Sequence, residues 1–167
     1  AVAQVGETTY NSFQEAQKAA LNELNTKDSV EIKLLKDTST ATFSNLSGAK
    51  TLVLDLNDKT LEVNQVQSIQ VTDGASLIIK NGNLTNFKLQ NGTGAFFIVT
   101  SNSSVIVKNT TIDTNGSALW PKGDAALVKV EDNSHIKAGV YAVATNANTV
   151  DNYKVKIDLS DSTLETP

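Results

Sequence analysis

The chain has 167 residues, with 14 lysines, no arginine, 18 acidic residues and one histidine, and its net charge is −4. A chain of this length typically forms one domain, and its hydrophobic fraction of 40% is too high for a disordered protein. No apolar run approaches the ~18 residues that a membrane-spanning helix needs. The lack of arginine and the negative charge argue against nucleic acid as a partner. The lack of cysteine excludes disulfide scaffolds and thiolate metal sites.

The sequence predicts one helix, over residues 12–24. Ser12 and Glu15 have the spacing of a capping box, in which the serine hydroxyl accepts a hydrogen bond from the N–H three residues later. Apolar residues then recur at helical spacing on one face, at Phe13, Ala16, Ala20, Leu21 and Leu24. The helix therefore has a single face to bury.

From Val30 to Leu164 the periodicity changes to two, which predicts an all-β body of short strands joined by polar turns. Residues 71–81 align without a gap to residues 99–109, and a weaker third copy begins at Val130. The offsets between related segments range from 25 to 31 residues, which is typical of a β-solenoid. A β-sandwich also has short strands, but it does not require one phrase to return at nearly fixed spacing.

Stacking of these copies predicts specific neighbours in adjacent coils. Two inward rows are expected, one of Leu52, Leu77, Val105 and Ile136, the other of Leu54, Ile79, Val107 and Ala138. The same alignment puts His135 level with Ser104 and Lys80 level with Lys108. Asn81 above Asn109 predicts a short amide ladder at a bend, although asparagine also suits the left-handed backbone of a turn, and both can hold together.

The rest of the coil region carries two further expectations. The segment 113–124, with its Asn-Gly and Pro-Lys-Gly sequences, is expected to bulge from the stack as a loop. The helix at 12–24 is expected to cover the N-terminal end of the solenoid, whose open ends expose apolar core and strand edges. Nothing after Leu164 could cover the other end. We therefore expect residues 1–167 to be one domain of a longer multi-module protein. The alternative is that self-association closes this end of the solenoid.

Four phrases resemble, in order, a family of bacterial surface proteins with a pectate-lyase-like right-handed parallel β-helix. They are VG followed by YNSFQEA (5–16), LLKD (34–37), LVLDLNDKTL (52–61) and GVYAVATN (139–146). Asp58 and Lys59 depart from the family pattern at a structural turn. The resemblance implies a right-handed parallel β-helix of about five or six coils, extracellular at the bacterial cell surface. It also implies tandem modules without catalytic chemistry.

A search for chemistry leaves few candidates. Pectate lyases of this fold resemble the chain in architecture, but they typically use an arginine base, and this chain has none. Paired carboxylates of a glycoside hydrolase could come from Asp113 and Asp124 beside Trp120, where an aromatic ring could stack on a sugar. A second acidic set, Asp55, Asp58 and Glu62, is explained by turn formation. The alternative for Trp120, which the sequence favours, is a hydrophobic plug for the loop, and His135 is alone.

The sequence therefore favours a noncatalytic module that acts as a rigid spacer or adhesin element, with glycan or cell-surface protein as partner. Trp120, Asp113 and Asp124 are the candidate binding residues. No catalytic residue, metal ion or cofactor is predicted. The alternative is a polysaccharide lyase or glycoside hydrolase. An enzyme should have a groove with two carboxylates, or with a lysine beside carboxylates, whereas a spacer should have an unbroken polar surface.

Overall fold

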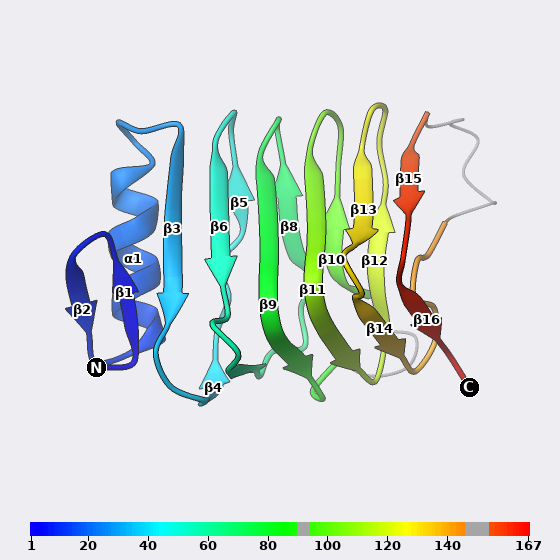
Figure 1. Ribbon diagram of the computed structural model, residues 1–167. Helices are drawn as coiled ribbons and strands as arrows, with labels where there is room; N and C mark the ends of the chain where they lie inside the picture. The colour runs from blue at the N-terminus through cyan, green and yellow to red at the C-terminus, as the bar shows by residue number, and fades with distance from the viewer. Residues whose placement is uncertain (90–93, 146–153) are drawn as a thin grey trace.

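A computed structural model describes residues 1–89, 94–145 and 154–167. The chain is a β-solenoid of about five turns, with mostly parallel strands stacked along one axis. In Figure 1 the near strands run downward and the far strands run upward while the chain advances from left to right, so the coil is right-handed. The predicted all-β parallel β-helix is thus confirmed. Asn146, the last residue of the fourth phrase, lies outside the described residues.

Two sheets form the walls of the solenoid. The smaller, four-stranded sheet contains β5 (Leu46–Ser47), β8 (Ile69–Thr72), β10 (Ala95–Val99) and β12 (Ser117–Pro121). The larger, 12-stranded sheet contains β1 (Ala3–Val5), β2 (Thr8–Tyr10), β3 (Ser29–Leu34), β4 (Thr38–Ala41), β6 (Thr51–Asp55), β7 (Thr60–Val63), β9 (Ser76–Asn86), β11 (Ser104–Thr114), β13 (Leu127–Glu131), β14 (His135–Ala138), β15 (Lys156–Leu159) and β16 (Thr163–Glu165).

The larger sheet bends at a corner inside the long strands β9 and β11, and the solenoid therefore has three faces. The front face consists of β3, β6, β13, β15 and the first halves of β9 and β11. The lower face consists of β4, β7, β14, β16 and the second halves of β9 and β11. The rear face is the smaller sheet. Figure 1 shows the front, lower and rear faces following one another in the coils between β3 and β13.

The register between copies is as predicted in the middle of the chain but differs beyond Val128. Leu77 lies opposite Leu52 and Val105, and the next residue in this row is Val128. The prediction that Ile136 and Ala138 continue the two inward rows is therefore wrong. Both belong to β14 on the lower face, where they lie opposite Ile112 and Thr114. The alignment failed because β13 and β14 share the same apolar alternation.

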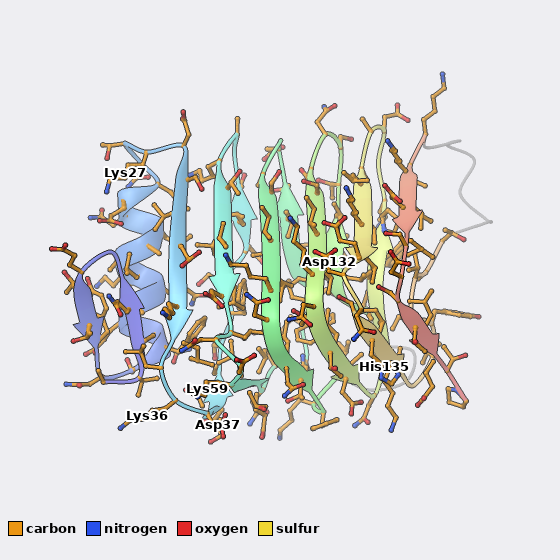
Figure 2. All side chains as sticks on the ribbon, viewed as in Figure 1. Lys27, Lys36, Asp37, Lys59, Asp132 and His135 are labelled. Carbon is orange, nitrogen blue, oxygen red and sulfur yellow. The ribbon has the colours of Figure 1, made fainter. Side chains whose placement is uncertain are left out.

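His135 moves with the same correction. It lies opposite Thr111 on the outer side of the lower face, not level with Ser104 (Figure 2). The Lys80–Lys108 pair is observed as predicted, with Glu131 next in that outward row. A strand alternation of period two therefore identified which residues point inward, but not which face they belong to.

The predicted loop at 113–124 is also wrong, because this segment runs along the wall of the solenoid. Residues 117–121 form β12, which pairs in parallel with β10, and Leu119 lies opposite Phe97 in the interior. Both side chains are fully buried. The Asn-Gly and Pro-Lys-Gly sequences that suggested a loop are corners between faces.

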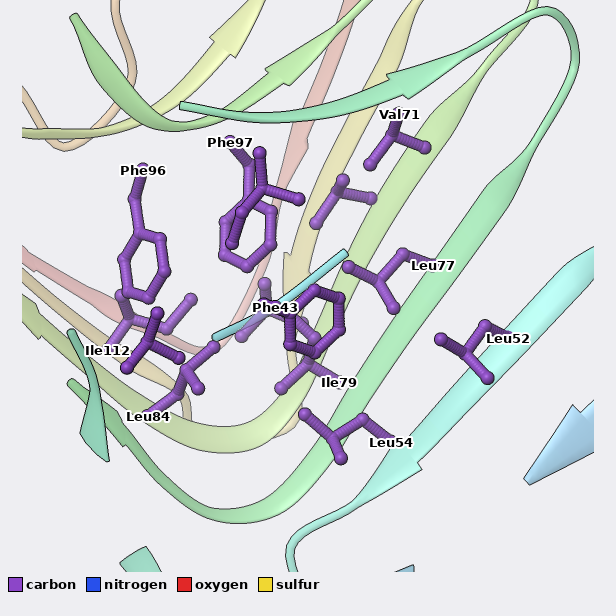
Figure 3. Packing of buried hydrophobic residues seen from close by; sticks show 14 of the residues in the cluster. Phe43, Leu52, Leu54, Val71, Leu77, Ile79, Leu84, Phe96, Phe97 and Ile112 are labelled. Carbon is purple, nitrogen blue, oxygen red and sulfur yellow. The ribbon is translucent and has the colours of Figure 1, made fainter. Parts of the chain in front are cut away.

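Aromatic rings connect the helix to the coils. Phe43 stacks on Phe13 with ring centroids 5.9 Å apart and meets Phe97 edge-on at 6.1 Å. Phe97 in turn stacks on Phe96 at 4.6 Å. Figure 3 shows Phe43, Phe96 and Phe97 beside aliphatic side chains of the front and lower faces, such as Leu54, Ile79 and Leu84. Offset and edge-on ring contacts add to the stabilisation from buried area.

The N-terminal end is covered by a helix and a hairpin. The helix α1 (Phe13–Glu23) begins after Ser12, whose hydroxyl accepts the Glu15 N–H at 3.1 Å. Gln17 is buried and its amide bridges Thr42 and Ser44, donating at 3.1 Å and accepting at 2.9 Å. The strands β1 and β2, which the periodicity did not predict, extend the sheet antiparallel beyond β3.

A column of left-handed residues marks the corner between the front and lower faces. Asn81 and Asn109 have φ of 62° and 44°, and the Asn109 amide donates to Asn81 Oδ1 at 3.1 Å. Asp132 and Asp161 continue the left-handed conformation in the next two coils, with φ of 57° and 44°. Each asparagine therefore provides both the turn geometry and a bond between coils.

Replacing Asn109 separates these two contributions. Asn109→Ala should lower the free energy of unfolding by about 1–2 kcal/mol, because it loses the amide bond and puts alanine in the left-handed region, which asparagine tolerates better. Asn109→Gly loses only the bond and should lower it by less. Urea denaturation of the three proteins measures both values. Unchanged stability in both variants would contradict the ladder.

Candidate functional site

Trp120 lies on the outer side of the rear face. It belongs to β12 and is opposite Ile98, which is itself opposite Gln70, so the three form an outward row across three coils. Its neighbour Leu119 points inward and is fully buried. The alternation of β12 therefore fixes the indole on the surface of a rigid wall, and Trp120 is not an interior plug.

A depression of about 240 Å³ lies beside the Trp120 ring. It is lined by Gly94, Ala95, Ser117, Trp120, Val140, Tyr141, Ala144 and Thr145. Tyr141 is the most open of the large side chains there, at 60% exposure. Two aromatic residues thus border a shallow, mainly apolar hollow with serine and threonine hydroxyls in its lining.

Backbone hydrogen bonds hold the two sides of this depression together. Ala118 donates its N–H to the Tyr141 carbonyl at 2.8 Å, and Ala144 donates to the Leu119 carbonyl at 2.7 Å. Lys122 Nζ lies 4.8 Å from the centroid of the Trp120 ring, within the range of a cation–π interaction. The depression is therefore preorganised, and a positive charge lies next to it.

The other two predicted binding residues lie elsewhere. Asp113 is on the outer side of the lower face, between Thr85 and Lys137 in the neighbouring coils. Asp124 lies at a corner after β12, where its Oδ1 accepts the Lys154 N–H at 2.9 Å. The three residues were predicted to share one loop. Because 113–124 instead runs through successive parts of a coil, the structure does not bring them together.

Asp113 contributes to a second cavity, of about 390 Å³, at the last coils of the lower face. Its lining includes Lys137, Glu165 and the half-exposed Phe87. The Glu165 carboxylate lies 3.5 Å from His135 Nε2 and 3.8 Å from Lys137 Nζ. Sequence reasoning did not select Lys137 or Glu165, because finding them requires the correct register across three coils.

The second acidic set predicted from the sequence serves turns and rows of the wall. Asp55 Oδ1 accepts the Asn57 N–H at 2.9 Å, and Asp58 occupies the left-handed region with φ of 61°. Glu62 lies opposite Thr85 on the lower face. These contacts agree with the structural role that the sequence favoured for the set.

A charge cluster lies on the front face, around Glu131. Its carboxylate is 3.2 Å from Lys129 Nζ and 3.5 Å from Lys108 Nζ. The pKa of Glu131 is lowered mainly by the hydrogen bond from Lys129, and Lys108 lowers it further. Partial loss of hydration acts in the opposite direction and raises the pKa. The cluster joins strands β11 and β13 of adjacent coils.

Within 1–89, 94–145 and 154–167, no three His, Asp or Glu side chains are grouped so that they could hold a metal ion. Over the same part of the chain, no helix has the length and apolar character needed to cross a membrane. Comparisons with protein families, with curated proteins and with solved structures found no match. The family resemblance therefore rests on the four phrases alone.

The pKa of Glu131 predicts a pH-dependent contribution to stability. Because the pKa is lowered on folding, the stabilisation is present at about pH 7 and is lost as the pH falls through the folded-state pKa. Glu131→Gln should therefore lower Tm most at neutral pH, and the difference from wild type should vanish in acid. Thermal unfolding followed by circular dichroism at several pH values measures this. Glu7→Gln in the exposed hairpin is the control, and a pH-independent difference would contradict the assignment.

Proposed function

We propose that this chain is a noncatalytic module of a bacterial surface protein, which acts as a rigid adhesin element and binds glycans at the Trp120–Tyr141 depression. The observation that carries the proposal is the preorganised aromatic pair, in which Trp120 lies on a stacked strand and Tyr141 lies on the segment that is hydrogen-bonded to that strand. Apolar faces of sugar rings pack on aromatic rings, while the hydroxyl of the exposed Thr145 can exchange hydrogen bonds with the ligand.

The rigid part of the proposal follows from the stacking. Each strand in the middle of the solenoid, such as β9 or β11, pairs with the coils on both sides, and coils in such a sheet are spaced by about 4.8 Å. The interior rows are fully buried at Leu54, Ile79, Val107 and Val130. Bending the solenoid would open these contacts, so the module would hold a binding site at a fixed distance from its anchoring point.

The surface location is supported by the four phrases shared with the bacterial family and by the polar composition. Asparagine, serine and threonine number 17, 14 and 19. Many of these residues occupy corners and outer faces, as the Asn81–Asn109 ladder and the Ser76–Ser104 hydroxyl contact at 2.7 Å illustrate. A neutral polar exterior suits a module that meets solvent on every long face.

The aromatic depression can be tested with a glycan array. Trp120→Ala should lower the affinity for any bound glycan at least ~10-fold, because a central aromatic contact dominates such a site. Gln70→Ala is the matched control, since this residue lies in the same outward row two coils away. Circular dichroism confirms that both variants are folded. Unchanged binding by Trp120→Ala would exclude the depression as the site.

A carbohydrate-active enzyme is the second candidate, and one observation favours it. Asp113, Lys137 and Glu165 line one cavity, which provides the lysine beside carboxylates that a lyase without arginine would need. Against this, the Glu165 carboxylate already lies next to His135 and Lys137. These contacts are sufficient to explain the grouping as a structural link between the last coils.

Turnover assays separate the two candidates. The protein should release no reducing ends and no unsaturated product from acidic or neutral polysaccharides, because the proposed function needs no reacting group. If release occurred and Asp113→Asn with Glu165→Gln abolished it, the enzyme would replace the binding module. Retained folding of the double variant, measured by thermal unfolding, is the control.

A further inference from the structure

The front face, which is turned toward the viewer in Figure 1, carries three outward rows of side chains on β3, β6, β9, β11 and β13. Residues of one row lie opposite one another on neighbouring strands. The first row consists of Ser29, Thr51, Ser76, Ser104 and Leu127. The second row consists of Glu31, Val53, Ile78, Ile106 and Lys129. The third row consists of Lys33, Asp55, Lys80, Lys108 and Glu131.

The centre of this face is apolar. Val53, Ile78 and Ile106 lie side by side on three adjacent strands, point away from the interior and are partly exposed. Glu31 lies at one end of this stripe and Lys129 at the other. The strands of the rear face, by contrast, contain no charged residue. An apolar centre with a charged rim is the organisation of a protein–protein interface.

The charges on the front face change sign between the two sides of β9. Each charged position one or two strands before β9 has a counterpart in the same row at the same distance after it. In all three such pairs the charges are opposite. A twofold axis along β9 exchanges the two sides, so this surface is complementary to itself. The pairs are Asp55 with Lys108, Lys33 with Glu131, and Glu31 with Lys129.

We infer that a second copy of this chain docks on the front face, with the twofold axis over β9 and parallel to the strands. Ile78 then meets Ile78 of the second copy, and Val53 meets Ile106 on both sides of the axis. The strands of the two faces run aligned, as they do in packed β-sheets. Each of the three charge pairs forms twice. The inference does not depend on the proposed glycan site, which lies on the rear face and stays open in the dimer.

Two of the paired charges have no ion partner within the copy to which they belong. Among the described residues, neither Lys33 nor Asp55 forms an ion pair. In the dimer Lys33 meets Glu131 of the second copy, and Asp55 meets Lys108. The contact between copies therefore provides partners for charges that the single solenoid leaves to water.

Shifting the axis along the solenoid opposes like charges. Half a coil toward β11, Lys80 lies over Lys108 and Asp55 lies over Glu131. Half a coil toward β6, Lys33 lies over Lys108. Like charges that face one another across an interface cost several kcal/mol and exclude such arrangements. The axis over β9 is the position at which all three charge pairs are opposite in sign.

Turning the axis has a similar effect. A twofold axis along the solenoid also keeps the strands aligned, but it puts Glu31 over Glu31 and Lys129 over Lys129. The axis over β9 opposes only Lys80 to itself. Lys80 Nζ lies 3.3 Å from the Glu31 carboxylate, so this side chain leans toward β3. Because the axis reverses that direction in the second copy, the two ammonium groups point apart.

The contact is small. Five strands about 4.8 Å apart and three outward residues about 7 Å apart give roughly 500 Å² on each copy. A total of roughly 1,000 Å² lies at the lower end of specific interfaces. At both ends Leu127 lies over Ser29, on the rim of a hollow of about 400 Å³ that Gly6 and Val30 also line. The dimer is therefore weak and reversible, and the front face meets solvent in the monomer.

Charge reversal tests the docking by sedimentation velocity at concentrations up to about 1 mM. The wild type should show a monomer–dimer equilibrium. Glu31→Lys and Lys129→Glu should each raise the dimer dissociation constant about 10-fold or more, because each opposes like charges twice. An equimolar mixture of the two variants should restore the dimer, as should both changes combined in one chain, since opposite charges then face one another again.

Glu62→Lys is the matched control, because it makes the same change on the outer side of the lower face, opposite Thr85. It should leave the dissociation constant unchanged. Exposed ion pairs contribute little to stability, and circular dichroism verifies that each variant is folded. A wild type that stays monomeric up to about 1 mM would overturn the inference. A dimer that both single variants preserve, or that their mixture fails to restore, would use another surface and overturn it equally.

Discussion

The in-register stacking of parallel strands is the constraint on which the whole structure depends. A strand in the middle of the solenoid pairs with both neighbours, so its backbone groups are satisfied only if the next coil follows at the same level. Because side chains alternate between interior and surface, one register then fixes the role of every residue. The row Leu54, Ile79, Val107 and Val130 shows the result, since all four side chains are fully buried.

The same constraint creates the features on the outer faces. Trp120 is held outward because Leu119 must point inward against Phe97. The rear wall beyond β12 is not a regular strand in the described residues, and Tyr141 meets it through single backbone bonds. A depression forms where regular stacking gives way to such a segment. The corners also depend on the stacking of the coils, because Asn81 and Asn109 combine a left-handed backbone with a hydrogen bond between adjacent coils.

The sequence predicted those parts of the fold that a gap-free repeat specifies. Residues 71–81 and 99–109 share one spacing, and the predicted neighbours Leu77 and Val105 lie opposite one another. The prediction failed where β12 was taken for a loop, because its corner sequences resemble loop sequences. The cavity around Asp113 could not be predicted for a different reason. Its lining residues come together only through the register of β11, β14 and β16, which the sequence alignment did not give correctly.

An edge strand is usually protected by charges that prevent another strand from pairing with it. The sequence Val155-Lys-Ile-Asp-Leu159 carries charges of both signs, symmetrically placed about Ile157. These charges lie on the outer side of β15, where they disfavour uncontrolled pairing with another strand. The opposite end of the solenoid is protected in a different way, because β1 pairs antiparallel with β3 and the helix α1 covers the first coil.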